Sequence, residues 1–390
     1  MKIAIFLGVP RNSISGYFIA VDNLQKGLRK AGHKVAFILP SYVDKRTSTY
    51  SYKSPLGMWF LPNIIESYVF KKLDDFKPDI IHNNDVGIVG VAAIKYAYDL
   101  NLPIVYTAHS EFKLFIDSFL PWYFRFWLTS LIVYWIRRYI NLCDTIIAPT
   151  KSMKDYLKRE KIRGNIIVQP SGLDLSDFEY CPRKFKKKEI NILFIGSMVK
   201  GKNVGLLVRM MNYLRNGKYK LSIVGGGVDI ERLRKLSKKL NLKNIIFYGS
   251  IVHKLVPKYY RNSDIFVSAS YTESQGLVYI EAMASGLPVI ALDNFGSRDI
   301  LINNKTGIIL HKADPKLFAK CIEKITNDQK MYEYYSRNAY EHAKNYDLSN
   351  TIPRVVKIYN KTIKNYKTER EKEGKISYFN KLIAKIHNKT

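Results

Sequence analysis

Two glutamates, Glu273 and Glu281, lie eight positions apart in the stretch SASYTESQGLVYIEAMASGLPVIALD. The pattern predicts a strand that ends near Ala269, a loop, and a helix from about Gly276 to Gly286, because glycine suits the left-handed position that closes a helix. Glu281 then lies inside a helix whose neighbouring residues are small or apolar. A buried carboxylate needs a partner, and the two hydroxyl groups of a ribose would provide one.

The alternative is a structural glutamate that pairs with an arginine such as Arg298. The position of the loop favours a ligand, however. Open α/β sheets bind ligands at the carboxyl ends of their strands, and the N-terminus of the following helix attracts phosphate. We therefore predict a nucleotide site in which Glu273, in the loop, faces the reacting end of the ligand.

The elements that must position these glutamates occur in two copies. Residues 2–40 and residues 190–226 each follow the order strand, loop, helix, strand. This repeat predicts two Rossmann-like α/β domains. Further strands are predicted at PDIIHNN and LPIVYTAHS in the first half, and at NIIFYGS, SDIFVSAS and LPVIALD in the second.

The domain boundaries follow from the basic run CPRKFKKKE, which places a linker near residues 172–188. We expect a first domain over 1–171, a second over 172–345, a helix over 346–366 that returns to the first domain, and a basic tail over 367–390. The tail contains ISYFNKLIAKIHNK, whose apolar residues fall on one helical face among lysines. This pattern is typical of a membrane-surface helix, and the alternative is a solvated helix.

The net charge of the chain indicates which classes of partner it attracts. Its 390 residues include 63 Lys+Arg against 33 Asp+Glu, a net charge of +30, which attracts nucleic acid or an acidic membrane surface. Cys143, Cys181 and Cys321 lie far apart, which argues against a disulfide framework and a structural zinc site and fits a reducing cytoplasm. The start, MKIAIFLGV, is predicted to be a first strand and not a signal peptide.

These motifs resemble a known family. The segment ESQGLVYIEAMASGLPV is similar to the E-x7-E segment of the retaining glycosyltransferases of family 4. The motifs YTAHS, APTKSMKDYL, PSGLDLSDF, KGKN, IVGGG and NNKTGIIL support the resemblance. It implies a GT-B fold, in which two Rossmann-like domains face across a cleft and a C-terminal helix returns to the first domain. The first domain would bind the acceptor and the membrane, and the second a nucleotide-diphosphate sugar.

The resemblance implies a role for each matching residue. Glu281 matches the glutamate that holds the nucleotide ribose, and Glu273 matches the catalytic glutamate that faces the transferred sugar. The backbone N–H groups of Gly276 and Leu277 would lie near the sugar and the diphosphate. Lys202 matches the lysine that neutralises the diphosphate.

Three further positions complete the predicted site. His109 is predicted to end a strand of the first domain and matches the catalytic histidine that contacts the donor sugar, and the alternative is a structural histidine. Gly16 would let the first loop approach the diphosphate without a side chain in the way. Ser197 stands where the family usually has an arginine, and Gly201 where it has a glutamate. Either Lys200 supplies the missing charge or diphosphate binding is weaker.

The sequence contains no D-x-D pair, so we predict an enzyme that needs no metal and no cofactor. Lys202, helix N-termini and loop amides would stabilise the charge that develops on the leaving group. The resemblance implies front-face attack, in which the departing phosphate helps to take the proton of the acceptor.

Residues 119–140, FLPWYFRFWLTSLIVYWIRRYI, form the most apolar and aromatic stretch of the chain. Pro121 and Arg125 interrupt it, and a membrane span here would break the first sheet. Aromatic and cationic residues on an apolar segment are typical of a membrane interface, and the alternative is a buried core helix. The predicted membrane or acceptor contacts are Trp122, Arg125, Trp127, Trp135, Arg137 and Arg138.

The motifs ESQGLVYIEA, APTKSMKDYL and AHSEFKLFI look most like those of the bacterial diacylglycerol glucosyltransferases. The leading prediction is a peripheral, monotopic enzyme at the cytoplasmic face of the cell membrane that moves glucose from UDP-glucose to 1,2-diacylglycerol. Transfer from a UDP- or GDP-sugar to lipopolysaccharide, capsule or another surface glycan is the alternative. A basic nucleic-acid-binding protein is a remote one, because the sequence shows no RNP motif, zinc finger or recognisable helix-turn-helix, and we expect no nucleic-acid partner.

Overall fold

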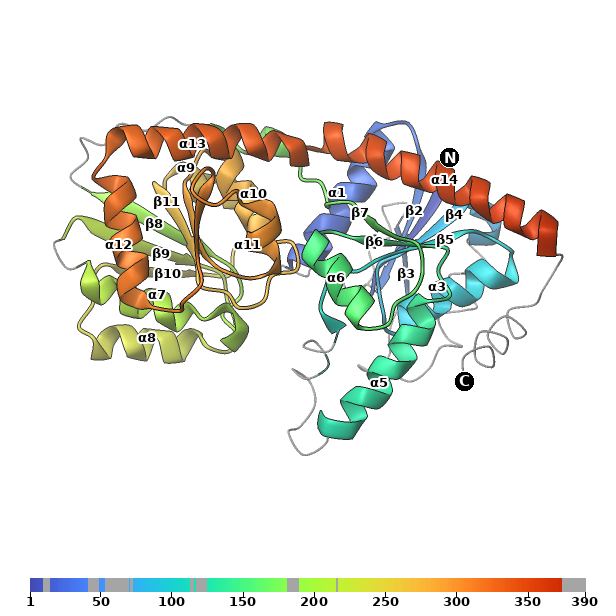
Figure 1. Cartoon of the computed structure of the whole chain (residues 1–390), viewed down its shortest axis with the longest axis horizontal. Helices are drawn as coiled ribbons and strands as arrows, with labels where there is room; N and C mark the ends of the chain where they lie inside the picture. Colours follow the sequence, from blue (N-terminus) through green and yellow to red (C-terminus); the bar gives the residue numbers. More distant parts are fainter. Residues whose placement is uncertain are drawn as a thin grey trace. The chain divides into compact units, whose positions relative to one another are not determined.

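The structure is a computed structural model that describes residues 1–9, 15–40, 49–52, 70, 73–112, 116, 125–180, 189–214 and 217–373. The chain divides into two units, shown in Figure 1. Unit 1 comprises Met1–Gly172 and Thr351–Thr390, and unit 2 comprises Leu173–Asn350. Each unit is built around one parallel sheet, so the two Rossmann-like repeats that the sequence predicts are confirmed.

The sheet of unit 1 has seven strands within the described residues, in the order β3-β2-β1-β4-β5-β6-β7. The strands are β1 (Lys2–Phe6), β2 (Lys34–Pro40), β3 (Thr49–Tyr52), β4 (Ile80–Asn83), β5 (Ile104–Thr107), β6 (Thr145–Ala148) and β7 (Ile166–Val168). Every residue of β4, β5 and β6 is buried. Strands that are buried along their whole length are typical of parallel sheets that helices cover on both faces.

The labelled α-helices that pack in unit 1 are α1 (Gly16–Lys30), α3 (Ile88–Asp99), α5 (Arg125–Ile140), α6 (Lys151–Arg159) and α14 (Leu348–Glu373). The Ser15 hydroxyl caps α1 by accepting a hydrogen bond from the N–H of Phe18. From Thr351 onward α14 belongs to unit 1, and it is red in Figure 1. Its Tyr359 hydroxyl lies 2.6 Å from His82 of β4, which confirms the predicted C-terminal helix that returns to the first domain.

The sheet of unit 2 has six strands in its described part, in the order β10-β9-β8-β11-β12-β13. The strands are β8 (Ile190–Ile195), β9 (Tyr219–Val224), β10 (Ile245–Gly249), β11 (Ile265–Ser268), β12 (Val289–Leu292) and β13 (Gly307–Leu310). The α-helices are α7 (Val204–Met210), α8 (Ile230–Lys239), α9 (Val256–Arg261), α10 (Leu277–Ala284), α11 (Phe295–Ile300), α12 (Pro315–Thr326) and α13 (Gln329–Ala343). The apolar core of unit 2 joins β8, β9 and β11 to α7 and α12.

Both sheets reverse their strand order beside the first strand. β1 lies between β2 and β4, and β8 lies between β9 and β11. The chain therefore leaves the sheet toward one edge after β1 or β8, and returns on the other side of that same strand. Open α/β sheets bind their ligands at such a reversal, outside the carboxyl ends of the two central strands.

The strands that the sequence predicts agree with the structure within one to three residues at each end. β3, β6, β7 and β13 lie outside the predicted strands, and each contains only three or four residues.

Gly90→Ala should destabilise unit 1, because a Cβ at Gly90 would lie 2.0 Å from the carbonyl oxygen of Asp85. We expect the free energy of unfolding to fall by about 1–3 kcal/mol, the usual cost of overpacking. Gly16→Ala is the matched control, because nothing lies within 4 Å of a Cβ there. All four tryptophans lie within residues 1–172, so denaturant titrations followed by tryptophan fluorescence report on unit 1. Equal stability of the two variants would contradict this packing.

Candidate functional site

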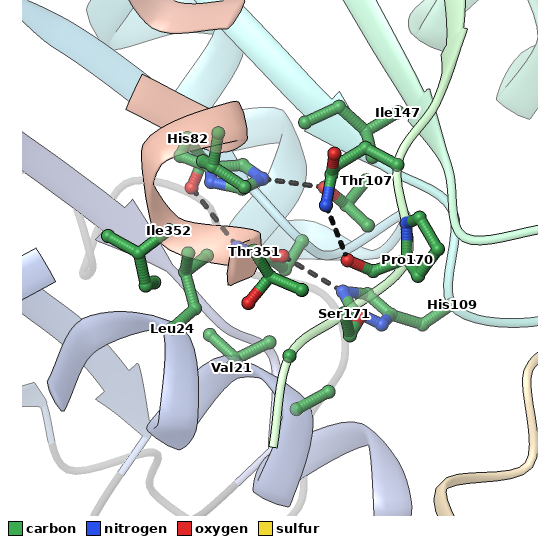
Figure 2. Close-up of a pocket in the computed structure, with 15 residues that line it drawn as sticks. Val21, Leu24, His82, Thr107, His109, Ile147, Pro170, Ser171, Thr351 and Ile352 are labelled. Atoms are coloured by element: carbon green, nitrogen blue, oxygen red, sulfur yellow. Dashed lines mark hydrogen bonds between the residues drawn. The ribbon is translucent and has the colours of Figure 1, made fainter. Parts of the chain in front are cut away.

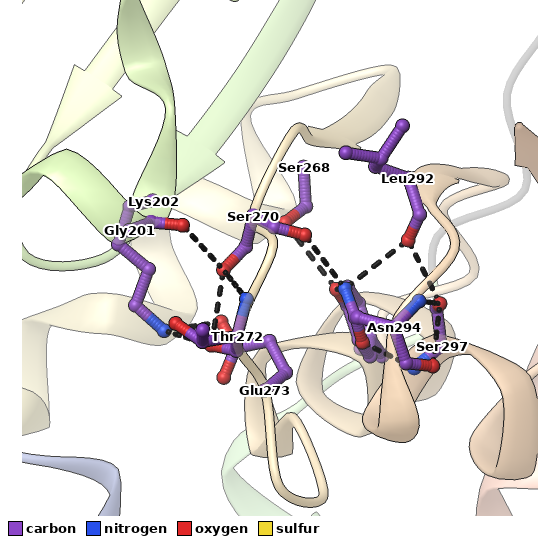
Figure 3. A network of polar contacts seen from close by, with 10 residues as sticks. Gly201, Lys202, Ser268, Ser270, Thr272, Glu273, Leu292, Asn294 and Ser297 are labelled. Carbon is purple, nitrogen blue, oxygen red and sulfur yellow. Dashed lines mark hydrogen bonds and ion pairs between the residues drawn. The ribbon is translucent and has the colours of Figure 1, made fainter. Parts of the chain in front are cut away.

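The strand reversal of unit 2 brings two predicted site residues together. Lys202 ends the short 3-10 helix η2 (Lys200–Lys202) after β8, and Glu273 lies in the loop after β11. The Lys202 Nζ lies 2.5 Å from the Glu273 Oε1 and 3.3 Å from the carbonyl oxygen of Thr272 (Figure 3). Both side chains are largely buried. Residues that are 71 positions apart in the chain thus form one ion pair at the point where the strand order reverses.

Backbone contacts hold the loop that carries Glu273. The N–H of Tyr271 donates to the carbonyl oxygen of Gly201 at 2.9 Å, and the N–H of Gly296 donates to that of Glu273 at 2.7 Å. The side chain of Asn294 donates to the carbonyl oxygen of Ser270 at 2.9 Å, as Figure 3 shows. The loop is therefore tied to the segments after both β8 and β12, which fixes the position of the Glu273 carboxylate.

Helix α10 begins at Leu277, directly after Gly276, and ends at Ala284, close to the predicted range. Gly276 has a φ of +77°, and a Cβ there would lie 2.5 Å from the ring of Tyr279, so only glycine fits. The first N–H groups of a helix have no partner within the helix and favour negative charge. Gly276 and Leu277 are thus in a position to bind an anion, and their contact with a diphosphate stays a prediction.

Glu281 is buried in α10, with 3% of its surface exposed. The Tyr260 hydroxyl donates to its Oε2 at 2.8 Å, and the His253 Nε2 lies 3.1 Å from its Oε1. Burial and then the Glu281 carboxylate raise the pKa of the Tyr260 hydroxyl well above its usual value, so this hydroxyl remains a donor. The protein itself thus supplies partners for this carboxylate, and its contact with a ribose stays a prediction.

The predicted alternative partner of Glu281 is wrong. Arg298 binds Asp293 instead, with its Nε and Nη2 3.1 Å and 3.0 Å from the carboxylate oxygens. Arg298 follows Asp293 by five residues, so this pair forms within the loop and the first turns of α11. Arg298 thus has a partner close by in the chain, whereas the partners of Glu281 among the described residues, His253 and Tyr260, lie on other elements.

Ser197 lies in the loop after β8 and is exposed. Lys200, at the start of η2, is exposed as well. Gly201 uses its carbonyl oxygen to hold Tyr271, and a Cβ there would meet the Thr272 hydroxyl at 3.0 Å. Whether Lys200 supplies the positive charge of the arginine expected at position 197, or diphosphate binding is weaker, stays a prediction.

His109 lies two residues after β5, at the corresponding edge of the sheet of unit 1. Its Nε2 lies 2.9 Å from the Oδ1 of Asn84, which follows β4, and the Tyr17 ring packs against its imidazole at a centroid distance of 4.8 Å. Burial lowers the pKa of His109 to about 3, so the ring is neutral at neutral pH. A base this weak is a poor acceptor for a whole proton, but it is a good acceptor for a hydrogen bond.

Gly16 is the first residue of α1, and no atom lies within 4 Å of the place where a Cβ would be. Packing against the described residues does not require a glycine here. The predicted close approach of a ligand to this end of α1 would explain why the residue is glycine, and it stays a prediction.

His82 is a site residue that the sequence analysis missed. It is buried in β4, and its two ring nitrogens lie 2.6 Å from the Tyr359 hydroxyl and 2.7 Å from that of Thr107. With His109 it lines a pocket whose other wall is apolar and includes Val21 of α1 (Figure 2). Burial, and then the charge of His109, lower the pKa of His82 to about 3. The sequence feature that could have identified His82 is the histidine that follows two isoleucines in the predicted strand PDIIHNN.

Helix α5 covers most of the predicted membrane segment and has two different faces. Thr129, Val133, Ile136 and Ile140 are buried, at the spacing of one helical face. Leu131, Tyr134 and Trp135 have 47%, 45% and 56% of their surfaces exposed. The prediction of a buried core helix therefore holds for one face only. None of the described helices is long and apolar enough to cross a membrane.

The cationic residues of the segment differ in their surroundings. The Arg137 Nη2 forms an ion pair with Glu160 at 2.5 Å, whereas the Arg138 guanidinium lies over the Tyr134 ring, 4.7 Å from its centroid. Arg125 and Trp127 lie at the start of α5, and the positions of their side chains are outside the described part. Trp122 and the amphipathic pattern at 376–389 also lie outside the described residues.

Two family models match successive parts of this chain, one in each half. One, described as Glycosyltransferase Family 4, matches residues 14–177, and the other, described as Glycosyl transferases group 1, matches residues 180–342. The chain belongs to the family 4 glycosyltransferases. The resemblance noted in the sequence, the GT-B fold and the assignment as a retaining glycosyltransferase are thereby confirmed.

The names of the relatives of this glycosyltransferase refer to different acceptors. The alpha-monoglucosyldiacylglycerol synthase of Streptococcus pneumoniae is 26% identical over 378 residues, which cover 87% of this chain and 83% of that protein. The capsular polysaccharide biosynthesis glycosyltransferase CapM of Staphylococcus aureus is 28% identical and covers 63% of this chain and 67% of its own. The structure of Anabaena HepE in complex with UDP-glucose has a TM-score of 0.75 at 16% identity, covering 93% of this chain and 100% of that one. That likeness concerns the fold alone.

Unit 1 of this glycosyltransferase should lose stability in acid because of His82. Its pKa of about 3 in the folded chain is below the ordinary value of about 6.5, so between these values the unfolded chain binds a proton that the folded chain does not. The stabilisation is complete above pH 6.5 and decreases as the pH falls toward 3, by up to about 1.4 kcal/mol per pH unit. Denaturant titrations at pH 7, 5 and 4, followed by tryptophan fluorescence, measure this slope.

His82→Gln should reduce the slope by up to about 1.4 kcal/mol per pH unit, because its amide does not titrate; the slope that remains includes the contribution of His109, whose pKa is also about 3. His311→Gln, an exposed histidine of unit 2, is the control and should leave the fluorescence transition of unit 1 unchanged. An equally steep acid loss in wild type and His82→Gln would show that the buried imidazole is not the cause.

Proposed function

We propose that this glycosyltransferase moves a hexose, glucose from UDP-glucose being the first candidate, to 1,2-diacylglycerol or a related membrane lipid with retention of configuration. The observation that carries the donor part is the ion pair of Lys202 and Glu273 at the strand reversal of unit 2, beside the N-terminus of α10. It joins a cation for the diphosphate to a carboxylate for the sugar hydroxyls. The UDP-glucose bound to the structurally similar HepE supports the choice of donor.

Lys202 has a different partner in the two stages of the proposed reaction. Before the donor binds, Glu273 neutralises the buried ammonium group, which prevents an unpaired charge. A diphosphate carries more negative charge than one carboxylate, so it competes for Lys202 when it binds. Glu273 is then released to accept hydrogen bonds from the sugar. Glu281, held by Tyr260 and His253, keeps its position for the ribose.

The proposed transfer breaks the bond from the sugar C1 to the β-phosphate oxygen and forms a bond from C1 to the acceptor oxygen on the same face. The acceptor proton passes to the departing phosphate oxygen. Lys202 and the first N–H groups of α10 stabilise the charge on the diphosphate as it leaves. His109 is too weak a base to take the proton at neutral pH, since its pKa is about 3, and we assign it a contact with the sugar instead.

The surface of α5 supports a lipid acceptor. We define the α5 surface as Leu131, Tyr134, Trp135 and Arg138, which combine exposed apolar and aromatic side chains with a cation. Such a surface suits the headgroup level of an anionic membrane, where aromatic rings are amphipathic anchors and cations meet lipid phosphate. The net charge of +30 adds a long-range attraction to the same partner. We therefore propose a peripheral position at the cytoplasmic face of the cell membrane.

The similarity to CapM supports a second candidate acceptor, a growing surface glycan on a lipid carrier. The donor chemistry would be the same. A product screen with both acceptor types separates the two.

Purified protein, UDP-glucose and anionic vesicles that contain diacylglycerol should yield a glucolipid that mass spectrometry identifies. Lys202→Met should lower kcat/KM for UDP-glucose by about 100-fold or more, because a preorganised cation at the leaving group is lost. The control is Lys220→Met, which removes a lysine that also pairs with a glutamate, Glu189, but on the surface at β9. Equal activity of the two variants would contradict the donor site, and product formation only on a saccharide acceptor would select the surface-glycan function.

Replacement of Leu131, Tyr134 and Trp135 by serine should weaken binding to anionic vesicles while leaving unit 1 folded, because all three side chains are exposed. Tyr334→Ser is the control, since Tyr334 is also 51% exposed but lies in unit 2 on α13. Vesicle sedimentation measures binding, which should also decrease as salt rises if charge contributes. Unchanged sedimentation of the triple variant would exclude the α5 surface as a membrane contact.

A further inference from the structure

Asn84 follows β4 directly and is almost completely buried. Its side-chain Nδ2 donates to two backbone carbonyl oxygens, that of Phe6 at 3.3 Å and that of His82 at 3.4 Å. These contacts fix the orientation of the amide, because an amide turned by 180° would place its Oδ1 against the same two carbonyl oxygens. The geometry of the ends of β1 and β4 therefore determines which amide atom faces away from the strands.

The amide oxygen that remains faces His109. The Oδ1 of Asn84 lies 2.9 Å from the Nε2 of His109. An amide oxygen only accepts hydrogen bonds, so the Nε2 must carry the hydrogen. A neutral imidazole has one N–H group, and burial keeps this ring neutral at neutral pH by lowering the pKa of His109 to about 3. The Nδ1 is therefore the nitrogen with the free lone pair.

A second element fixes the same ring. Tyr17, the second residue of α1, donates its hydroxyl hydrogen to the main-chain carbonyl oxygen of Asn84. Its ring packs against the imidazole of His109 with an interplanar angle of 43°. Burial, and then the nearby Asp85 carboxyl, raise the pKa of Tyr17 well above its usual value, so its hydroxyl stays a donor. Residues from α1 and from the end of β4 thus leave the imidazole one tautomer and little rotational freedom.

A ring held in this way has one remaining capacity. Its N–H is engaged by Asn84, so it does not donate to a ligand, and its Nδ1 lone pair is suited to a hydrogen-bond donor. A sugar hydroxyl is such a donor. We propose that Asn84 is a positioning residue, which holds His109 in the Nε2–H tautomer so that the Nδ1 accepts a hydrogen bond from a hydroxyl of the transferred sugar.

The tautomer of His109 follows from contacts within unit 1, whereas its sugar partner rests on the proposed function. The tautomer can be measured without sugar transfer, so the failure of one is distinguishable from the failure of the other.

The tautomer is measured without any activity assay. In ¹⁵N NMR spectra of histidine-labelled protein at pH 7, His109 should show a protonated Nε2 and an unprotonated Nδ1, with its signals identified by their absence from His109→Gln. A protonated Nδ1 in the wild-type protein would overturn the proposal, whether or not the chain transfers sugar.

Two substitutions test the role of Asn84. Asn84→Leu removes the acceptor, so both tautomers of His109 should become populated, and kcat/KM for UDP-glucose should fall by about 10-fold or more, the effect of one lost hydrogen bond in the transition state. Asn84→Asp should rescue both, because a buried, protonated carboxyl group donates its one hydrogen to one of these backbone carbonyl oxygens and turns its other oxygen toward the Nε2. If Asn84→Leu fails to fold, the test rests on the tautomer in the wild-type spectrum and on the tautomer and activity of Asn84→Asp.

The matched control is Asn83→Leu, which removes the neighbouring buried amide, whose Oδ1 accepts from the N–H of Asp85 at 3.0 Å. A merely structural role predicts the same losses in both leucine variants. The proposal predicts that only Asn84→Leu changes the tautomer, and a changed tautomer in Asn83→Leu as well would contradict it.

Monodeoxy analogues of UDP-glucose identify the hydroxyl. With the wild-type protein, one analogue should react more slowly than UDP-glucose, because it lacks the hydroxyl that His109 binds. With that same analogue, wild type and Asn84→Leu should react equally fast, because the hydrogen bond is already absent. If every analogue were equally sensitive to Asn84→Leu, the sugar hydroxyl would be the wrong partner. If no nucleotide sugar were a donor while His109 still showed the Nε2–H tautomer, the proposed function would fail and the tautomer would stand.

Discussion

The reversal of strand order beside β1 and β8 is the constraint on which the candidate site depends. A parallel sheet places all carboxyl ends at one edge, and only at the reversal do the loops of neighbouring strands turn to opposite sides. In unit 2 this arrangement brings Lys202, after β8, to Glu273, after β11. In unit 1 it brings Asn84, after β4, to the ends of β1 and β5. The same topology therefore produces a polar cluster in each unit from residues that are distant in the chain.

The two clusters differ in their electrostatics. The cluster of unit 2 contains a full ion pair beside a helix N-terminus, which suits an anionic ligand. The cluster of unit 1 is neutral, because burial keeps His82 and His109 uncharged at neutral pH. Hydroxyl groups lie within hydrogen-bond distance of both ring nitrogens of His82, and the Asn84 amide oxygen accepts from the Nε2 of His109. A neutral cluster of this kind suits hydroxyl groups as ligands, in keeping with the proposed contact between His109 and the sugar.

Helix α5 shows how one segment can satisfy two demands. Its buried face, with Val133 and Ile136, belongs to the core of unit 1, and its opposite face presents Leu131 and Trp135 to solvent. Exposed aromatic and aliphatic groups on one helix are unfavourable in water unless a partner covers them. This arrangement explains why the sequence of the segment is apolar almost throughout and yet fits neither a membrane span nor a fully buried helix.

The sequence by itself determined the fold class, most strands and the family, because those depend on local patterns: apolar runs, the repeat of strand, loop and helix, and the spacing of Glu273 and Glu281. It also placed Lys202 and His109 at strand ends. Only the tertiary structure decided the partners. Glu281 is held by Tyr260 and His253 and not by Arg298, and Asn84 determines the tautomer of His109. Hydrogen-bond partners depend on which strand ends become neighbours in the sheet, and no local pattern of residues contains that information.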